Sequence, residues 1–259
     1  MRIRLAVIAM PDLRSTINLN ELDIYVELSG TGVPLVLLHG FSGAGCNWEL
    51  IFPEPPAGFQ LIVPDLRGHG RSTNPSGIFT HRQSALDVFA LLDQLGIMTF
   101  RAIGMSCGAK TLLHMATQQP DWVEAMVLVS ATPYFPKEPR LAMSQLSPDN
   151  RSEAEWEQMR RWHKHGDNQI RLLWTLGNRF KDSYDDVNFT PPLLSTIKAR
   201  TLIVHGDRDP LYPVALALEM YQAIPKGMLW VVPNGGHGPI FGDQTPHFVE
   251  TAVKFLMTQ

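Results

Sequence analysis

The chain alternates between two spacings of hydrophobic residues. Short, mostly apolar runs recur along it, at residues 35–38, 61–63, 100–104, 125–130, 201–205 and 228–232. Such runs are typical of strands buried on both faces, as in a parallel sheet. Between them, apolar residues recur at helical spacing, over residues 80–95, 110–118, 216–223 and 248–257. Strands that alternate with helices predict an α/β fold, in which a mainly parallel twisted sheet carries helices on both faces.

Local signals mark the ends of two elements. Thr80 stands just before a helical pattern and Gln83 follows three residues later, which predicts a capping box, while Gly96 marks the end of that helix. Nearer the N-terminus, polar and apolar residues alternate after a polar turn at residues 20–21. This pattern predicts a β-hairpin over residues 18–28.

One long segment lacks the strand pattern. Residues 133–197 contain no convincing strand, but residues 153–163 and 169–176 have helical spacing. An insertion of this kind between two strands predicts a small helical cap, and a purely structural helical excursion is the alternative. The sequence therefore predicts a core made of residues 1–132 and 198–259, with a cap or lid over residues 133–197.

Composition and charge narrow the class of protein. The chain has 259 residues, of which 44% are hydrophobic and 18% charged, and its net charge is −3. Its basic residues are scattered, which favours neither nucleic-acid binding nor attachment to an anionic membrane. Cys46 and Cys107 are too few for a disulfide framework, and no apolar stretch approaches the ~20 residues of a membrane span. The first ten residues favour an early strand or arm over a signal peptide. We therefore expect a soluble, cytoplasmic protein of undetermined oligomeric state.

A serine lies between small residues where a predicted strand meets a predicted helix. Residues 104–108 read Gly-Met-Ser-Cys-Gly, and Ala109 follows. A tight strand-to-helix turn exposes a serine, but it crowds the backbone two residues to either side, so small residues are needed there. The same turn aims the Cys107 N–H into the space above the serine, where the helix dipole favours negative charge. Ser106 is therefore the candidate nucleophile.

A second serine, Ser42, also follows an apolar strand. Ala44 replaces the second glycine of the pattern there and no convincing helix begins after it, so we interpret Ser42 as a loop residue. The turn before it can instead point the Phe41 N–H at a developing oxyanion. Phe41 and Cys107 together predict an oxyanion hole with two backbone donors, and the His39 side chain is expected to be packed structurally.

Nine histidines compete for the role of general base. His237 stands among glycines on a loop just after a predicted strand, which suits a side chain that must reach a catalytic centre. The others are expected to be packed or solvated, namely His39, His69, His81, His114, His163, His165, His205 and His247. The acid that orients the imidazole should come from another strand end. Two aspartates compete there, Asp207 and Asp209.

Several motifs make the chain resemble the α/β-hydrolase superfamily over nearly its whole length. They are the His-Gly turn at residues 39–40, the run Asp-Leu-Arg-Gly-His-Gly-Arg-Ser at residues 65–72, the turn at residues 104–108, the loop at residues 206–209 and the Gly-His pair at residues 236–237. In that family the acid usually falls three residues after the glycine, which implies Asp209, and the order along the chain is Ser, Asp, His. The resemblance also implies that residues 133–197 are the family's cap or lid.

At several positions this chain differs from particular branches of the family, which limits the members that it resembles. Ser106 stands where epoxide hydrolases and haloalkane dehalogenases carry aspartate. The triple-glycine oxyanion loop of hormone-sensitive-lipase-like esterases is absent. Proline iminopeptidases usually have Trp and Gly beside the nucleophile, where this chain has Met105 and Cys107. The remaining similarity is to small-cap carboxylesterases, enol-lactonases, carbon–carbon bond hydrolases and cofactor-free perhydrolases.

We therefore expect a serine hydrolase that cleaves a small carboxylic ester or lactone through an acyl-enzyme on Ser106. His237 is the expected base and Asp209 the orienting acid, and no metal or cofactor is implied. Large apolar side chains are candidates for the substrate pocket, namely Trp48, Met105, Phe135, Trp156, Trp162 and Trp174. The alternatives are a carbon–carbon bond hydrolase or perhydrolase with the same triad, or a ligand-binding receptor on a hydrolase fold.

Overall fold

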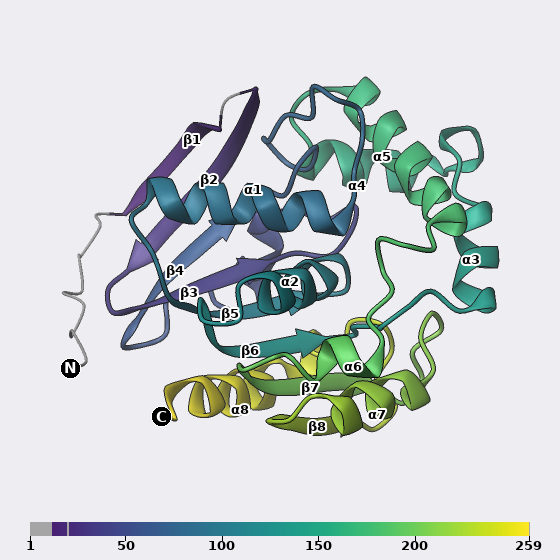
Figure 1. Cartoon of the computed structure of the whole chain (residues 1–259). Coiled ribbons are helices and arrows are strands. Elements are labelled where there is room, and N and C mark those ends of the chain that lie inside the picture. Colours follow the sequence, from purple (N-terminus) through teal and green to yellow (C-terminus); the bar gives the residue numbers. More distant parts are fainter. Residues whose placement is uncertain (1–11, 20, 259) are drawn as a thin grey trace.

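The computed structural model of the chain describes residues 12–19 and 21–258. Eight strands form one sheet in the order β1-β2-β4-β3-β5-β6-β7-β8 (Figure 1). The strands are β1 (Leu13–Leu19), β2 (Leu22–Gly30), β3 (Val33–Leu38), β4 (Phe59–Pro64), β5 (Phe100–Met105), β6 (Val123–Val129), β7 (Arg200–Gly206) and β8 (Gly227–Val232). β2 pairs antiparallel with β1 and with β4, and the pairings from β4 to β8 are parallel. The predicted α/β fold with a mainly parallel sheet is confirmed.

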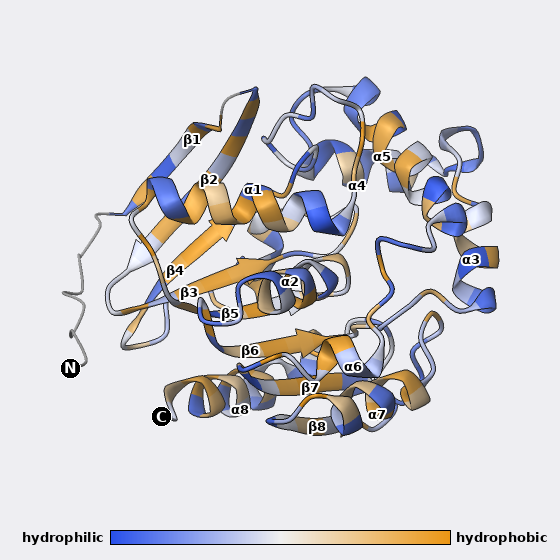
Figure 2. Cartoon of the chain, viewed as in Figure 1, coloured by the Kyte–Doolittle hydropathy of each residue, from blue (hydrophilic) through white to orange (hydrophobic). Residues whose placement is uncertain are grey.

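Helices cover both faces of this sheet. The α-helices are α1 (His81–Gln94), α2 (Cys107–Gln118), α3 (Lys137–Ser144), α4 (Glu153–Trp162), α5 (Asp167–Arg179), α6 (Pro191–Leu194), α7 (Val214–Ala223) and α8 (Thr245–Met257). Leu92 of α1, Leu112 of α2 and Leu216 of α7 belong to one buried apolar cluster, whereas Phe248 and Leu256 of α8 belong to another. Figure 2 shows the reason, because the central strands are almost continuously hydrophobic and must be covered on each side.

Helices α3 to α6 all lie in the segment between β6 and β7. Figure 1 shows α3, α4 and α5 together on the side towards which the parallel strands point. The chain before α3 is joined to the chain after α5, because Tyr134 and Asn188 form an antiparallel bridge and the Phe189 N–H donates to the Pro133 carbonyl at 2.8 Å. The helical character expected for residues 133–197 is present, while their role as a cap stays a prediction.

The two local sequence signals have different outcomes. Strands β1 and β2 form the predicted hairpin and are longer than expected; of its turn, Asn20 lies outside the described residues, as do the first eleven residues. Thr80 caps α1 by accepting a hydrogen bond from the Gln83 N–H at 3.0 Å. The Gln83 side chain does not return to Thr80, because it donates to Asp87 at 3.1 Å. The predicted capping box is thus only half formed.

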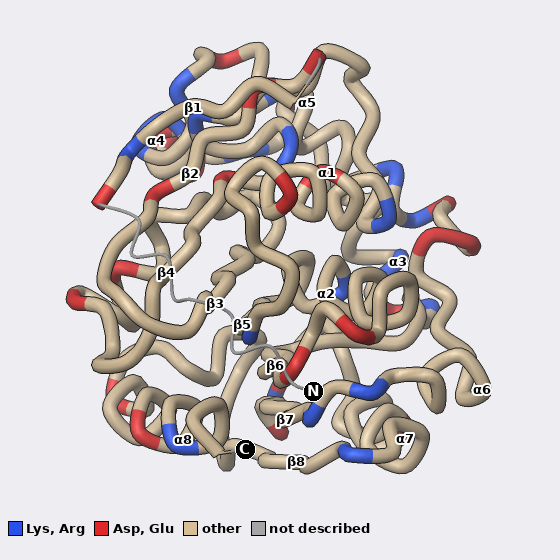
Figure 3. Tube along the Cα trace, turned by 60° about the vertical axis from the view of Figure 1, so that its left-hand side comes forward, with Lys and Arg blue, Asp and Glu red and all other residues tan. Residues whose placement is uncertain are grey.

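Charged residues lie mainly on the outer elements and loops, where both signs are intermixed (Figure 3). Within residues 12–19 and 21–258, none of the helices combines the length and the apolar character that crossing a bilayer requires. Cys46 and Cys107 are both free thiols.

A buried ion pair fastens the loop after β4 to α1. Arg67 Nε and one terminal nitrogen each donate to a different Asp87 oxygen at 2.7 Å, and both side chains are nearly inaccessible to solvent. His69, two residues further on, is fully buried and contacts the Arg67 carbonyl through Nδ1 at 2.9 Å. These contacts give Arg67 and His69 a structural role.

The Asp87→Ala variant is expected to lower the free energy of unfolding by about 3–5 kcal/mol, because it leaves the Arg67 guanidinium buried without its counter-ion. Glu124→Ala is the matched control. It removes the partner of Arg101 at 3.3 Å, but the Glu124 side chain is 47% exposed, so the expected loss is within about 1 kcal/mol. Urea unfolding of both variants measures the difference, and equal losses would contradict this account of the Arg67–Asp87 pair.

Candidate active site

Ser106 stands on the sharp turn between β5 and α2, with φ at +49°. With ψ at −102°, this backbone conformation is sparsely populated and costs about 1–3 kcal/mol. Hydrogen bonds to neighbouring strands hold it, from the Ser106 N–H to the Val129 carbonyl at 2.8 Å and from the Gly108 N–H to the His39 carbonyl at 3.0 Å. The glycine is needed because a Cβ at Gly108 would lie 2.1 Å from the Leu38 carbonyl oxygen. The crowding predicted from the sequence is therefore present at this turn.

The structure brings the three predicted polar side chains into one hydrogen-bonded chain. His237 Nε2 lies 2.9 Å from Ser106 Oγ, and His237 Nδ1 lies 2.9 Å from Asp209 Oδ2. A carboxylate can only accept, so the proton of a neutral imidazole sits on Nδ1 and is donated to Asp209. This leaves Nε2 free to accept the proton of the Ser106 hydroxyl. The arrangement can thus draw the hydroxyl proton towards the imidazole.

Asp209 is held by the backbone as well as by His237. Its Oδ1 accepts from the N–H groups of Leu211 at 2.8 Å and Tyr212 at 3.1 Å. Burial acts to raise the pKa of this carboxyl, but the His237 and backbone hydrogen bonds outweigh burial and lower it. The competing Asp207 is exposed. The geometry therefore brings Asp209, and not Asp207, to the imidazole.

Two backbone N–H groups border the same space. Phe41 lies in the loop after β3 and Cys107 is the first residue of α2, and both line the cavity that contains Ser106. Within the described part of the chain, neither N–H has a hydrogen-bond acceptor. Burial raises the pKa of the Cys107 thiol to about 12, which keeps the sulfur protonated. Cys107 can therefore donate a hydrogen bond to an oxyanion through its backbone N–H, whereas its thiol has no such role.

The cavity beside Ser106 has a volume of about 290 Å³. Of the side chains predicted to line the pocket, Met105 and Phe135 do so, next to Ser106 and His237. A second cavity of about 360 Å³ shares Phe41 and Met105 with the first in its lining. Trp48 and Trp162, also predicted for the pocket, line this second cavity. The two cavities therefore adjoin at these shared residues.

Trp156 and Trp174 line neither of these two cavities, contrary to the prediction. Their rings contact each other edge to face, with centroids 4.5 Å apart, and both are buried in a small cluster with Met159, Ile170 and Leu173. The error has a physical cause, since packing α4 against α5 buries both indoles inside the helical segment. These two residues are removed from the candidate pocket.

Two other histidines support the loop that carries Phe41. His39 is buried and accepts from the Leu66 N–H at 2.9 Å, while Nδ1 contacts the Gly40 carbonyl at 2.8 Å. His163, just after α4, accepts from the Gly70 N–H at 2.8 Å and lies 3.1 Å from the carbonyl of Ser42. Burial lowers the pKa of both imidazoles to about 4, so they remain neutral at pH 7. Both histidines are therefore packed structurally.

Three polar residues of the cavity were not predicted from the sequence. Lys110, His81 and Tyr212 all line the space beside Ser106, and all three are at most 2% exposed. One signal could have indicated Lys110, which lies four residues after Ser106 and therefore one helical turn along α2. His81 and Tyr212 gave no such signal, because they reach the cavity from distant parts of the chain. Across residues 12–19 and 21–258, no group of three or more His, Cys, Asp or Glu side chains could hold a metal ion.

Comparison with known proteins supports the resemblance seen in the motifs. The family model described as the alpha/beta hydrolase fold matches residues 33–154. The chain is 27% identical to the 2-hydroxymuconate semialdehyde hydrolase of Pseudomonas sp. (strain CF600), covering 81% of this chain and 82% of that protein. It is 25% identical to the pimeloyl-acyl-carrier-protein methyl ester esterase of Nitrosomonas europaea, covering 83% of this chain and 93% of that protein.

A solved structure gives the same result for the fold. The enol-lactonase of Burkholderia xenovorans LB400 superimposes with a TM-score of 0.76 at 21% identity, over 94% of this chain and all of that one. The strand order, the turn at Ser106 and the family match agree with each other. The family match and these relatives support assignment of the chain to the α/β-hydrolase superfamily, and they support a hydrolase activity.

Proposed function

We propose that the protein is a serine hydrolase that cleaves a small carboxylic ester or lactone, in the manner of the small-cap branch of its superfamily. The observation that carries this proposal is the hydrogen-bonded chain of Ser106, His237 and Asp209, with both heavy-atom distances at 2.9 Å, at the edge of a cavity. The names of two relatives, an ester hydrolase and an enol-lactonase, support this substrate class.

The first half of the reaction acylates the serine. His237 Nε2 takes the proton of Ser106 Oγ as the oxygen attacks the carbonyl carbon, and the C=O electron pair moves onto the carbonyl oxygen. The N–H groups of Phe41 and Cys107 donate to this oxyanion. Asp209 stabilises the imidazolium that forms. When the tetrahedral intermediate collapses, His237 returns its proton to the alcohol, which leaves, and the acyl group stays on Ser106.

The second half reverses these roles for water. His237 removes a proton from water as its oxygen attacks the acyl carbonyl, and the same two N–H groups hold the second oxyanion. Collapse releases the carboxylic acid and returns the proton to Ser106. The two cavities that share Phe41 and Met105 in their linings would hold the acyl and alcohol parts of the substrate, and residues 133–197 would act as a cap over them.

Labelling with a fluorophosphonate tests the assignment of the nucleophile. The probe should phosphonylate one serine at a rate far above that of the heat-denatured protein, and peptide mapping should place the adduct on Ser106. Ser42 is the informative comparison, because it follows a similar strand and also lines the cavity. An adduct on any residue other than Ser106 would overturn the mechanism.

A screen of substrates separates ester hydrolysis from the alternatives. Turnover of 4-nitrophenyl acetate, butyrate or hexanoate supports the esterase, and its absence across all three favours a ligand-binding receptor. The carbon–carbon bond hydrolase remains the second candidate. It is tested with 2-hydroxymuconate semialdehyde, the substrate in the name of one relative. The cytoplasmic location expected from the sequence stays a prediction.

A further inference from the structure

A buried lysine lies in the cavity beside the proposed nucleophile. Lys110 belongs to α2, is 2% exposed and lines the same 290 Å³ space as Ser106. Its backbone N–H donates to the Ser106 carbonyl at 3.1 Å, so the two residues are one helical turn apart. Helical side chains lean towards the N-terminus of their helix. The ammonium group is therefore directed to the end of α2 at which Ser106 stands.

The surroundings of Lys110 stabilise a cation only weakly. The hydrogen bond that Nζ makes is to the Tyr212 hydroxyl at 3.3 Å, which is long. The ring centroids of Tyr212 and Phe135 lie 5.2 and 5.4 Å from Nζ. Cation–π contacts at this distance compensate for only a small part of the cost of burying a charge. A buried ammonium usually has an anionic partner, and within the described residues no carboxylate forms an ion pair with Lys110.

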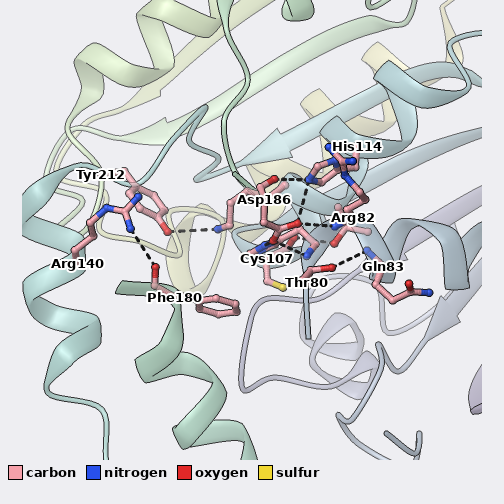
Figure 4. Close-up of polar contacts among 12 residues, drawn as sticks. Thr80, Arg82, Gln83, Cys107, His114, Arg140, Phe180, Asp186 and Tyr212 are labelled. Atoms are coloured by element: carbon pink, nitrogen blue, oxygen red, sulfur yellow. Dashed lines mark hydrogen bonds and ion pairs between the residues drawn. The ribbon is translucent and has the colours of Figure 1, made fainter. Parts of the chain in front are cut away.

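The nearest carboxylates already have other partners. Asp186 accepts from the backbone N–H of His81 at 2.8 Å and of Arg82 at 3.0 Å, and its side chain contacts the rings of His81 and His114 at 2.6 and 3.5 Å. Figure 4 shows Asp186 turned towards His114 and Arg82. Tyr212, whose hydroxyl contacts Lys110 Nζ, lies on the opposite side of Asp186 from these two residues. Asp209 is occupied by His237. The cavity thus contains a cation whose counter-ion the described part of the chain does not supply.

We propose that the missing counter-ion is a carboxylate of the substrate, which Lys110 and the Tyr212 hydroxyl bind while Ser106 attacks the ester carbonyl. This inference rests on the proposed function and specifies its substrate class. The cavity volume of about 290 Å³ is at the lower end of ligand pockets, so the chain between carbonyl and carboxylate is short. The substrate is therefore a half-ester of a short dicarboxylic acid, or a lactone that bears a carboxylate.

The first experiment compares two substrates that differ in charge and hardly in shape. Monomethyl glutarate carries the carboxylate, and methyl glutaramate replaces it by a neutral amide. The wild-type protein should hydrolyse the half-ester with a kcat/KM roughly ten- to a hundred-fold higher, which is the usual worth of a hydrogen-bonded charge pair away from water. Equal values of kcat/KM for the two esters would overturn the inference, whatever the behaviour of any variant.

The second comparison uses Lys110→Met, which keeps the length of the side chain and removes its charge. This variant should lose the preference for the half-ester. Lys198→Met is the matched control, because Lys198 is 61% exposed and pairs with Asp121 on the surface; it should keep the wild-type preference. A Lys110→Met protein that still prefers the half-ester would show that another group recognises the carboxylate.

Binding to Ser106→Ala gives a readout that does not need turnover. Calorimetry should detect tighter binding of monomethyl glutarate than of methyl glutaramate, and the difference should vanish in the double variant with Lys110→Met. If wild-type protein hydrolyses both esters equally, the inference fails and the proposed function stands. If neither ester is hydrolysed and Ser106→Ala still selects the half-ester, the proposed function fails and the anion site stands. Equal binding of both esters contradicts the anion site.

The preference should also depend on pH. Burial lowers the pKa of Lys110 to about 8, so the ammonium is present below that value and is lost above it. The ratio of kcat/KM for the two esters should therefore fall as the pH rises from 7 to 9.5. Because the same general base serves both substrates, effects on the hydrolysis step that the two esters share cancel in the ratio. A lysine that only packs between two rings would leave the ratio unchanged.

The other groups that face Lys110 keep their charge state over this range. Burial lowers the pKa of His81 to about 4 and raises that of Cys107 to about 12. It also raises the pKa of the Tyr212 hydroxyl. Burial acts to raise the pKa of Asp186, but hydrogen bonds from His114 and His81 outweigh it, so this carboxylate stays ionised, as does Asp209. A change in the ratio near pH 8 can therefore be assigned to Lys110.

Discussion

Replacing Ser106 with alanine is expected to lower kcat for a 4-nitrophenyl ester by about 10⁴-fold or more, while KM changes little. The hydroxyl is the atom that the 2.9 Å contact to His237 Nε2 would activate, and without it only water can attack. His237→Ala should cost about as much, because the two groups act as one unit. The double variant should then be no slower than either single one. Steady-state kinetics of the three proteins measure this.

Ser195→Ala is the matched control for these variants. Ser195 is exposed, and its hydroxyl donates to the Pro192 carbonyl at 2.7 Å within the short helix α6. The same chemical change should leave kcat at the wild-type value there. If Ser106→Ala retained more than about a tenth of the wild-type kcat, the acyl-enzyme mechanism would be wrong. Multiplicative losses in the double variant would show that Ser106 and His237 do not share a step.

Gly108→Ala is expected to destabilise the fold strongly, with a loss of about 4 kcal/mol or more in the free energy of unfolding. A methyl group there would meet the Leu38 carbonyl oxygen at 2.1 Å and its carbonyl carbon at 2.5 Å. These are backbone atoms of the central strand β3, so they cannot move aside as a flexible side chain would. Losses of this size are exceptional for single substitutions and require a defined steric cause.

Thermal unfolding gives the measurement. For a chain of this length each 1 kcal/mol shifts Tm by roughly 2–4 °C, so Gly108→Ala should lower Tm by about 10 °C or fail to fold. Gly77→Ala is the control, because a methyl group there meets nothing within 4 Å and only the φ of +64° opposes it. That strain should cost about 1–2 kcal/mol. Equal shifts in Tm for the two variants would refute the close approach of α2 to β3.

Prediction from the sequence works best where a residue with a reactive side chain stands in a turn of distinctive backbone geometry. Ser106 and His237 could be predicted because each stands at a strand end among small residues, and such positions have few structural uses. The strands β3 to β8 were predictable for a similar reason, since an unbroken apolar run has few alternatives to a buried strand. Position alone left Asp207 and Asp209 open for the acid, and the resemblance to the α/β hydrolases, in which the acid falls three residues after the glycine, implied Asp209.

Contacts between distant segments could not be predicted in the same way. Asp186 reaches His81 across 105 positions and His114 across 72, and no periodicity encodes such pairings. Trp156 and Trp174 were assigned to the pocket as large apolar residues, although burial against each other satisfies them equally well. Lys110 was overlooked because helix α2 is buried on nearly all sides, and a lysine in a sequence is ordinarily interpreted as exposed.

The bridge between Tyr134 and Asn188 has an evolutionary consequence. Because it joins the chain just before α3 to the chain after α5, these three helices begin and end at nearly one place. Insertions, deletions and exchanges among α3, α4 and α5 can then accumulate without disturbing the order of the strands. Descendants of such a chain could acquire new substrate preferences by remodelling these helices, while Ser106 and His237 keep their places on loops that follow strands of the sheet.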